Sequence, residues 1–127
     1  MMEIDLSTDG TASPARTRHL AEAFAEIARV LNHATMHREA LEFPSDADGL
    51  LRDLALAAAR LPQLCSQVAR WVAAEDAAGR VAVPSGEWAG RPRTAVTELQ
   101  VRLEMARADA EALRADLEYA AQVTSDL

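Results

Sequence analysis

The sequence predicts an all-α protein, an up-down-up bundle of three long helices. Along three segments, apolar residues recur at alternating spacings of four and three, which places them on one face of a helix. Proline and glycine separate these segments, and no alternation of strand and helix patterns occurs. The composition agrees, because 28 of the 127 residues are alanine while aromatic residues make up only 4%. Such a composition suits closely packed helices better than a deep cavity with aromatic walls.

The length of the chain fits a single domain preceded by a tail. Residues 1–12 are polar and contain Gly10, so we expect them to form a disordered N-terminal tail. Residues 13–127 carry all three apolar patterns. We therefore expect residues 13–127 to form one helical bundle domain.

The first helix is expected to begin at Ser13 and Pro14. Serine supplies a capping oxygen, and proline fits the first turn, where no backbone N–H is needed. The helix should run to about Leu41, because Pro44 biases Phe43 away from helical geometry. The residues that recur at spacings of four and three, and so share one face of this helix, are Leu20, Phe24, Ile27, Leu31, Ala34, Arg38 and Leu41.

The second helix is expected to open at Ser45–Asp48, where acidic side chains complement the helix dipole, and to end at Gly79. Pro62 lies inside it and removes one backbone hydrogen bond, so two short helices, and four in all, are the alternative. The apolar register continues unchanged across Pro62, which favours one helix kinked there. The predicted core line is Leu50, Leu54, Ala57, Leu61, Leu64, Val68 and Trp71, widened by Leu51, Ala58, Cys65 and Val72.

The third helix follows the one long connection, residues 79–92. Three glycines and two prolines exclude a helix in this connection. The helix should begin near Pro92 to Thr94 and run almost to the end of the chain. Its core line is Val96, Leu99, Leu103, Ala106, Ala110, Leu113, Leu117 and Ala120.

Charge and targeting signals narrow the classes of partner. The net charge is −7, and all 13 basic residues are arginines scattered among acidic residues. Nucleic-acid binding requires a clustered basic face, so it is not expected. The first residues lack the basic start and apolar run of a signal peptide, and no apolar stretch approaches the ~20 residues that span a bilayer. These features predict a cytoplasmic protein without a membrane partner.

No group of residues predicts a catalytic or cofactor site. His33 and His37 are four apart on the first helix, and Glu26 projects from nearly the same side, so these three residues are weak candidates for a metal face. The single Cys65 excludes an internal disulfide, and its place on the apolar stripe predicts an inert thiol. We therefore expect a protein that is not an enzyme and has no cofactor, with metal binding as a third hypothesis.

Trp88-Ala89-Gly90 lies between the second and third predicted helices. This Trp-x-Gly resembles the WXG100 family of secreted helical hairpins, small dimeric effectors in which the motif forms the hairpin turn. The chain departs from that family by its additional N-terminal helix. It also has Val123 four residues after Tyr119, where the family's trailing signal has an acidic residue. The resemblance implies a secreted helical effector as the alternative function.

A second resemblance covers more of the chain. The segments 31–42 and 61–71, together with the third helix rich in alanine and arginine, are similar to a group of small helical proteins of actinobacteria, of the Streptomyces type. No activity is established for that group. The resemblance implies a host and a helical fold, and it leaves the 32–42 surface as a possible recognition patch.

The third helix carries a second apolar row that its place in a bundle does not require. At about 100° per residue, this row lies roughly 150° from the core line, with charged residues between the two. An apolar strip bordered by charge is typical of a contact site. We therefore expect a non-enzymatic interaction or regulatory accessory protein that forms a homodimer or binds another helical protein. The predicted interface is Val101, Met105, Ala108, Ala112, Tyr119 and Val123, with Ala115 also in the row.

Overall fold

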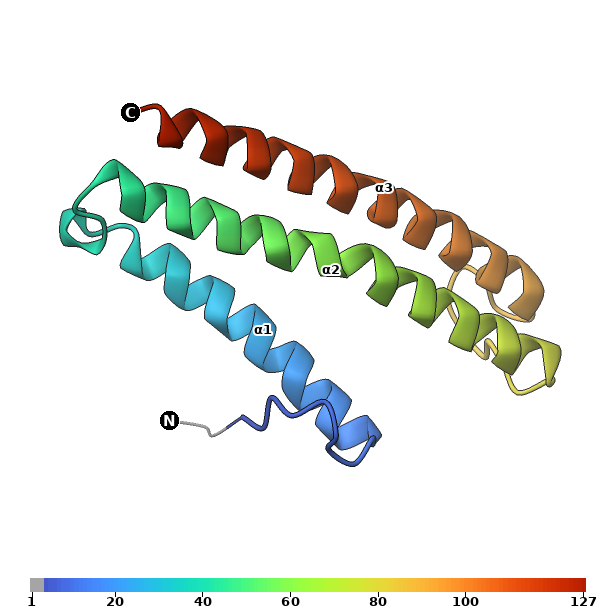
Figure 1. Ribbon diagram of the computed structural model, residues 1–127. Coiled ribbons are helices and arrows are strands. Elements are labelled where there is room, and N and C mark those ends of the chain that lie inside the picture. Colours follow the sequence, from blue (N-terminus) through green and yellow to red (C-terminus); the bar gives the residue numbers. More distant parts are fainter. Residues whose placement is uncertain (1–3) are drawn as a thin grey trace. The chain divides into compact units, whose positions relative to one another are not determined.

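The computed structural model describes residues 4–127, and this range holds three α-helices and one short 3-10 helix. No strand occurs in the described range. The prediction of an all-α fold with three long helices is confirmed. The elements are α1 (Pro14–Ala34), η1 (Arg38–Ala40), α2 (Pro44–Ala77) and α3 (Pro92–Ser125), and Figure 1 labels the three α-helices.

The chain divides into two compact units, Met1–Glu42 and Phe43–Leu127. The first unit contains α1 and η1, and the second contains α2 and α3. The single domain expected from residue 13 to residue 127 stays a prediction.

The N-terminal tail expected at residues 1–12 is described from residue 4 onward. Residues 4–12 form no helix, in agreement with the sequence, and residues 1–3 lie outside the described range. The Ser7 carbonyl accepts a hydrogen bond from the Arg16 guanidinium, which links the tail to the first turn of α1. The disorder of the tail stays a prediction.

α1 begins where the sequence predicts and ends earlier. The Ser13 hydroxyl oxygen accepts a hydrogen bond from the Arg16 backbone N–H at 3.0 Å, and proline occupies the first turn. The predicted end near Leu41 is wrong, because α1 stops at Ala34. The hydroxyl of Thr35, the next residue, donates to a carbonyl of the last turn at 2.8 Å. Asparagine, histidine and threonine favour the helix less than alanine or leucine, so the segment after Leu31 propagates the helix poorly.

α2 is one continuous helix. It begins at Pro44, within one residue of the predicted start, and continues through Pro62 to Ala77. The alternative with two short helices in this segment is therefore excluded. Gly79 follows the helix with a φ of +73°, a conformation that glycine adopts without steric strain.

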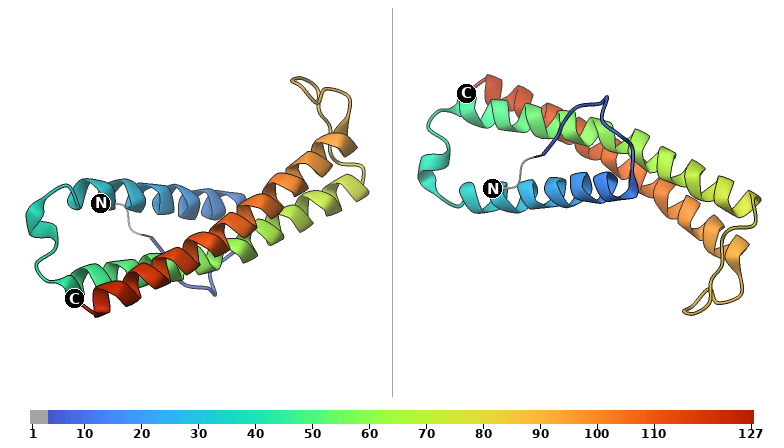
Figure 2. Two further views of the ribbon diagram at one scale, coloured as in Figure 1. Left: turned by 90° about the horizontal axis from the view of Figure 1, so that it is seen from above. Right: turned by 90° about the horizontal axis from the view of Figure 1, so that it is seen from below.

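α2 and α3 run antiparallel and lie side by side along their lengths (Figures 1 and 2). Weakly exposed residues recur along each helix every three or four positions, and we call these two rows the seam. The buried seam residues are Ala55, Ala58, Val96, Ala110 and Ala121. The other seam residues are Leu51, Pro62, Cys65, Ala69 and Val72 on α2, and Gln100, Leu103, Arg107, Arg114 and Leu117 on α3.

The predicted core line of α2 lies one residue away from the seam. Leu64 and Trp71, both expected in the core, are 54% and 65% exposed. The row that only widened the prediction, from Leu51 to Val72, forms the seam itself. Two neighbouring rows of α2 both have four-three spacing, and only one of them can face α3. The row with the smaller side chains does so, because small residues let two helix backbones approach closely.

On α3 the prediction is correct at every second position. Val96, Leu103, Ala110 and Leu117 lie in the seam. The other residues of the predicted core line each directly precede a seam residue in the sequence. Arginine occupies the seam at 107 and 114, and the arginine stem can pack while the guanidinium stays in water. A pattern that scores only apolar residues misses these positions.

The close approach of α2 and α3 generates the first prediction. Ala58→Leu should destabilise the protein by about 1–3 kcal/mol, because extra methyl groups cannot fit a tightly packed seam. Thermal melting followed by circular dichroism measures the effect. Ala59→Leu is the matched control, since Ala59 is exposed on the same helix. Equal melting temperatures for the two variants would contradict the seam.

Candidate interaction surface

The predicted interface on α3 is exposed along its whole length. Its two largest side chains, Met105 and Tyr119, are 51% and 73% exposed, and the valines at both ends are about half exposed. We call this set the outer row. It consists of Val101, Met105, Ala108, Ala112, Tyr119 and Val123.

Ion pairs within α3 border one side of the outer row. The Arg107 guanidinium contacts the Glu104 carboxylate at 2.6 Å and the Glu111 carboxylate at 3.2 Å. The Arg114 guanidinium contacts the Glu118 carboxylate at 2.7 Å. The hydrogen bond from Arg107 lowers the pKa of Glu104, although this carboxylate is exposed to solvent. The outer row is thus an apolar strip beside charges that already have partners.

One face of the α2–α3 hairpin combines polar side chains with apolar ones, among them Leu56, which is 55% exposed. A groove between the helices is lined by Arg52, Ala55, Leu56, Ala59, Glu118 and Gln122. Arg52, Ala59, Glu118 and Gln122 each directly follow a seam residue in the sequence. Successive residues of a helix are about 100° apart, so residues that directly follow the seam lie on this face, and residues that directly precede it lie on the other.

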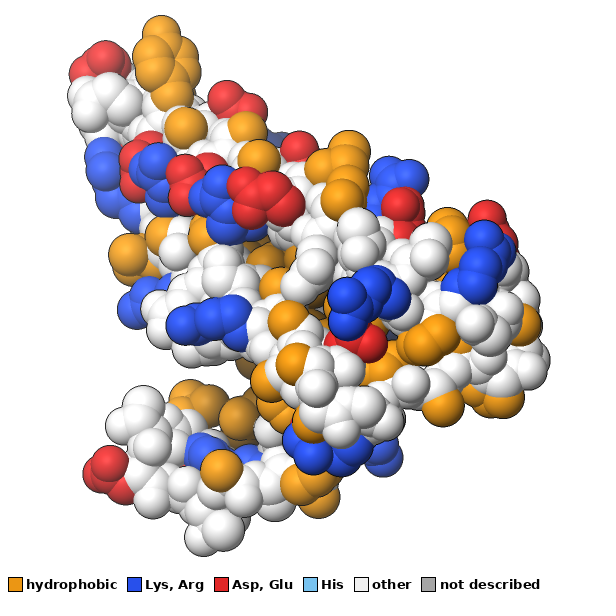
Figure 3. Space-filling view, turned by 90° about the vertical axis from the view of Figure 1, so that its right-hand side faces the viewer, with side chains coloured by type: hydrophobic (Ala, Val, Ile, Leu, Met, Phe, Trp, Pro, Cys, Tyr) orange, Lys and Arg blue, Asp and Glu red, His pale blue; other side chains and the backbone are white. Residues whose placement is uncertain are grey.

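The other face carries large apolar side chains, and we call it the hairpin face. Its five large residues each directly precede a seam residue, and all five are exposed. Figure 3 views the molecule from the loop end and shows apolar side chains interspersed with acidic and basic ones on the surface. Sequence reasoning missed this surface because it assigned the same residues to the core. The large residues of the hairpin face are Leu64, Val68, Trp71, Leu99 and Leu113.

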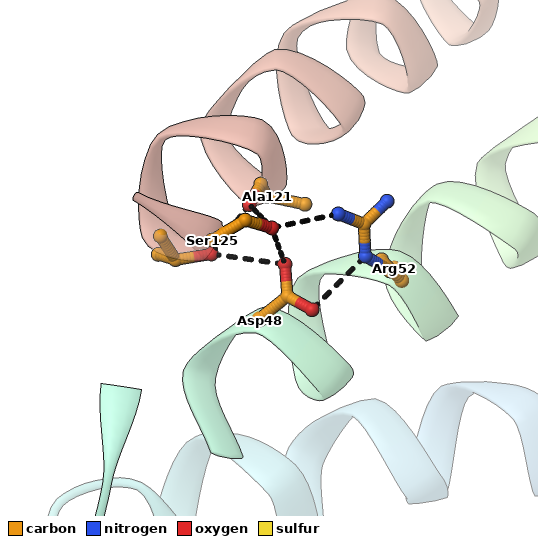
Figure 4. Close-up of polar contacts among 5 residues, drawn as sticks. Asp48, Arg52, Ala121 and Ser125 are labelled. Carbon is orange, nitrogen blue, oxygen red and sulfur yellow. Dashed lines mark hydrogen bonds and ion pairs between the residues drawn. The ribbon is translucent and has the colours of Figure 1, made fainter. Parts of the chain in front are cut away.

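A polar cluster joins the start of α2 to the end of α3 (Figure 4). One carboxylate oxygen of Asp48 accepts hydrogen bonds from the Thr124 hydroxyl at 3.2 Å and the Ser125 hydroxyl at 3.1 Å. The other oxygen accepts from Arg52 Nε at 3.0 Å. The Arg52 hydrogen bond is the main cause that lowers the pKa of Asp48, and the two hydroxyls lower it further. The cluster fixes the register between α2 and α3. No sequence motif predicted it.

The weak metal candidates are only partly brought together. The rings of His33 and His37 meet edge to face, with centroids 5.3 Å apart. Glu26 instead pairs with Arg29, whose hydrogen bond lowers the pKa of this carboxyl group. Within residues 4–127 no group of three or more histidine, cysteine, aspartate or glutamate side chains could hold a metal ion.

The Trp-x-Gly motif lies in the loop between α2 and α3. The Arg91 guanidinium carbon lies 5.3 Å from the centroid of a Trp88 ring, a cation–π contact. The Gly90 N–H donates to the Val83 carbonyl at 2.8 Å, and Gly90 has a φ of +70°. The loop is therefore closed by its own backbone and by one aromatic contact.

The Asp48 cluster generates a pH-dependent prediction. A carboxyl whose pKa is lowered on folding stabilises the protein above its unfolded pKa of about 3.9, and this stabilisation is lost as pH falls through the lower folded value. Asp48→Asn should therefore lower the melting temperature at pH 7, and the difference from wild type should vanish at low pH. Asp53→Asn is the control, because Asp53 is exposed and pairs with no described residue. A difference that persists unchanged at pH 2 would contradict this role.

The exposed histidines generate a third prediction. His33→Ala combined with His37→Ala should change the free energy of unfolding by no more than about 0.5 kcal/mol, as exposed substitutions usually do. Denaturant unfolding measures this change, and metal analysis of both proteins accompanies it. Stoichiometric zinc that disappears in the double variant would establish the metal hypothesis instead.

The comparisons add no functional assignment. Within the described range, no helix has both the length and the apolar character needed to cross a membrane. The chain matches no protein-family model, no curated protein and no solved structure.

Proposed function

We propose that the chain is a non-enzymatic helical interaction protein of the cytoplasm, which associates with itself or binds a helical partner. The observation that carries the proposal is an inversion of side-chain size in the hairpin. Its buried residues are four alanines and one valine, while Leu64, Trp71, Met105 and Tyr119 are each more than half exposed. Apolar surface of this extent gains free energy when another protein covers it.

The outer row supports a helical partner in particular. Apolar residues at helical spacing form a straight strip that a second amphipathic helix can follow. Ala108 and Ala112 leave room for close approach in the middle of the strip. Met105 adapts to irregular surfaces, and Tyr119 offers a large apolar ring with a polar tip, so both suit anchoring positions.

A secreted effector is the alternative, and the loop geometry is the observation that favours it. Trp88 and Gly90 lie where two long antiparallel helices are joined, which is the position of the motif in the family that it resembles. Export of the untagged protein into the medium by a specialised secretion system would support this alternative. Retention of the protein inside the cells would support the cytoplasmic proposal.

The outer row generates the fourth prediction. Met105→Glu combined with Tyr119→Glu should abolish capture of a helical partner from the source cells, because two charges replace the anchoring side chains. Quantitative pull-down with mass spectrometry compares this variant with wild type. Gln67→Glu combined with Thr97→Glu is the matched control, since both residues are exposed, polar and outside the outer row. Identical captured proteins for all three chains would refute the outer row as the interface.

A further inference from the structure

We infer that the hairpin face binds a second copy of this chain, antiparallel, about a twofold axis that crosses α2 at Leu64 and α3 at Asp109. The inference rests on the proposed function, because both state that the protein works by associating with another protein chain. It concerns a different surface, since the outer row lies on the far side of α3. Like helices would face one another, α2 against α2 and α3 against α3.

On the hairpin face, the side chains of α2 match in size those of a second, antiparallel copy of α2. A twofold contact pairs residue i with residue j and residue j with residue i. An antiparallel axis at Leu64 sets Leu64 against its own copy and the large, exposed Trp71 against the small Ala57. The neighbouring row pairs Leu61 with Val68 about nearly the same point. Trp71, the bulkiest residue of the face, therefore meets a residue that leaves room for it, whereas Leu64 meets leucine and Leu61 meets valine.

The rows of α3 have the same property about Asp109. The exposed Leu113 is set against Ala106, and Leu99 is set against Ala120. Both pairs again match a large side chain with a small one. Such matching is what close packing between two surfaces requires.

Charge at the outer edge of the face agrees with this alignment. Arg102, Asp109 and Asp116 directly precede seam residues, so they lie on the same side of the hairpin as the apolar rows. The axis at Asp109 sets Arg102 of each copy against Asp116 of the other, which gives two attractive pairs. Asp109 meets its own copy and gives one repulsive pair. Asp116 makes no ion pair with any described residue of its own chain. The Arg102 guanidinium contacts the Glu98 carboxylate of its own chain at 3.1 Å, so in the dimer it would be shared between Glu98 and Asp116 of the other copy.

The hairpin register allows one axis to serve both helices. Asp48 hydrogen-bonds to Thr124 at one end of the hairpin, and Asp76 contacts Arg93 at 3.9 Å at the other. Between these contacts, Leu64 is level with the turn of α3 that ends at Asp109. The centre of complementarity on α2 and the centre on α3 therefore coincide to within about one turn, ~5.4 Å.

The test exchanges charges on the full chain, with self-association measured by sedimentation equilibrium at low salt. Arg102→Asp alone and Asp116→Arg alone should each weaken the dimer about tenfold, because each creates two like-charge pairs. An equimolar mixture of the two variants should recover dimers, and so should the double variant. Residues 102 and 116 are ~21 Å apart along one helix, so contacts within a single chain cannot produce this rescue.

Two further variants sharpen the result. Asp109→Asn should strengthen the dimer, since it removes the repulsion on the axis. Arg70→Asp should leave the dimer unchanged, because Arg70 directly follows the seam residue Ala69 and is therefore exposed on the face opposite to the hairpin face. Circular dichroism of every variant confirms that the helices remain folded.

Three outcomes would overturn the inference. The first is a wild-type chain that stays monomeric at ~100 µM, and the second is a mixture no more dimeric than either variant alone. The third is a dimer that survives Leu64→Glu with Trp71→Glu and is lost with Met105→Glu and Tyr119→Glu. That third outcome, like partner capture by a monomer, refutes the hairpin face and leaves the proposed function standing.

Discussion

The close approach of α2 and α3 is the constraint on which the rest of the hairpin depends. Alanine at 55, 58, 110 and 121 keeps the space between the helices narrow. Where alanine lines it, the narrow seam has no room for larger side chains, and Leu64, Trp71 and Leu113 lie outside it. The same constraint explains why arginine stems suffice at positions 107 and 114. The exposed apolar surface is thus a direct consequence of how this pair of helices packs.

The sequence predicted the helices well because local rules decide them. Ser13 with Pro14, Gly79, and the glycines and prolines of the loop act through backbone geometry within a few residues. The end of α1 was not predicted because no proline or glycine follows Ala34 directly. The helix ends there because several residues with low helix propensity come together and the Thr35 hydroxyl caps the last turn. The register between α2 and α3 also escaped, because it depends on which of two adjacent rows finds the better partner.

The two exposed apolar surfaces of the hairpin also differed in how far the sequence predicted them. The outer row was recognisable from the sequence because it lies nearly opposite both the predicted and the observed seam of α3. The outer row stays exposed even when the seam shifts by one residue. The hairpin face was not recognisable, because Leu64 and Trp71 differ from core residues only by that same shift. The Asp48 cluster joins residues that are distant in sequence. Their proximity depends on the pairing of α2 with α3, which no local sequence pattern specifies.

Packing of this kind couples stability to association. Burying alanine removes far less apolar surface from water than burying leucine or tryptophan, so the seam alone stabilises the hairpin weakly. A partner on either apolar surface binds only the folded hairpin, because the unfolded chain does not present the rows. Binding to the folded state alone raises apparent stability as the partner concentration rises. If the proposed function is right, the apolar side chains outside the seam therefore recognise the partner, and their burial on binding also stabilises the folded hairpin.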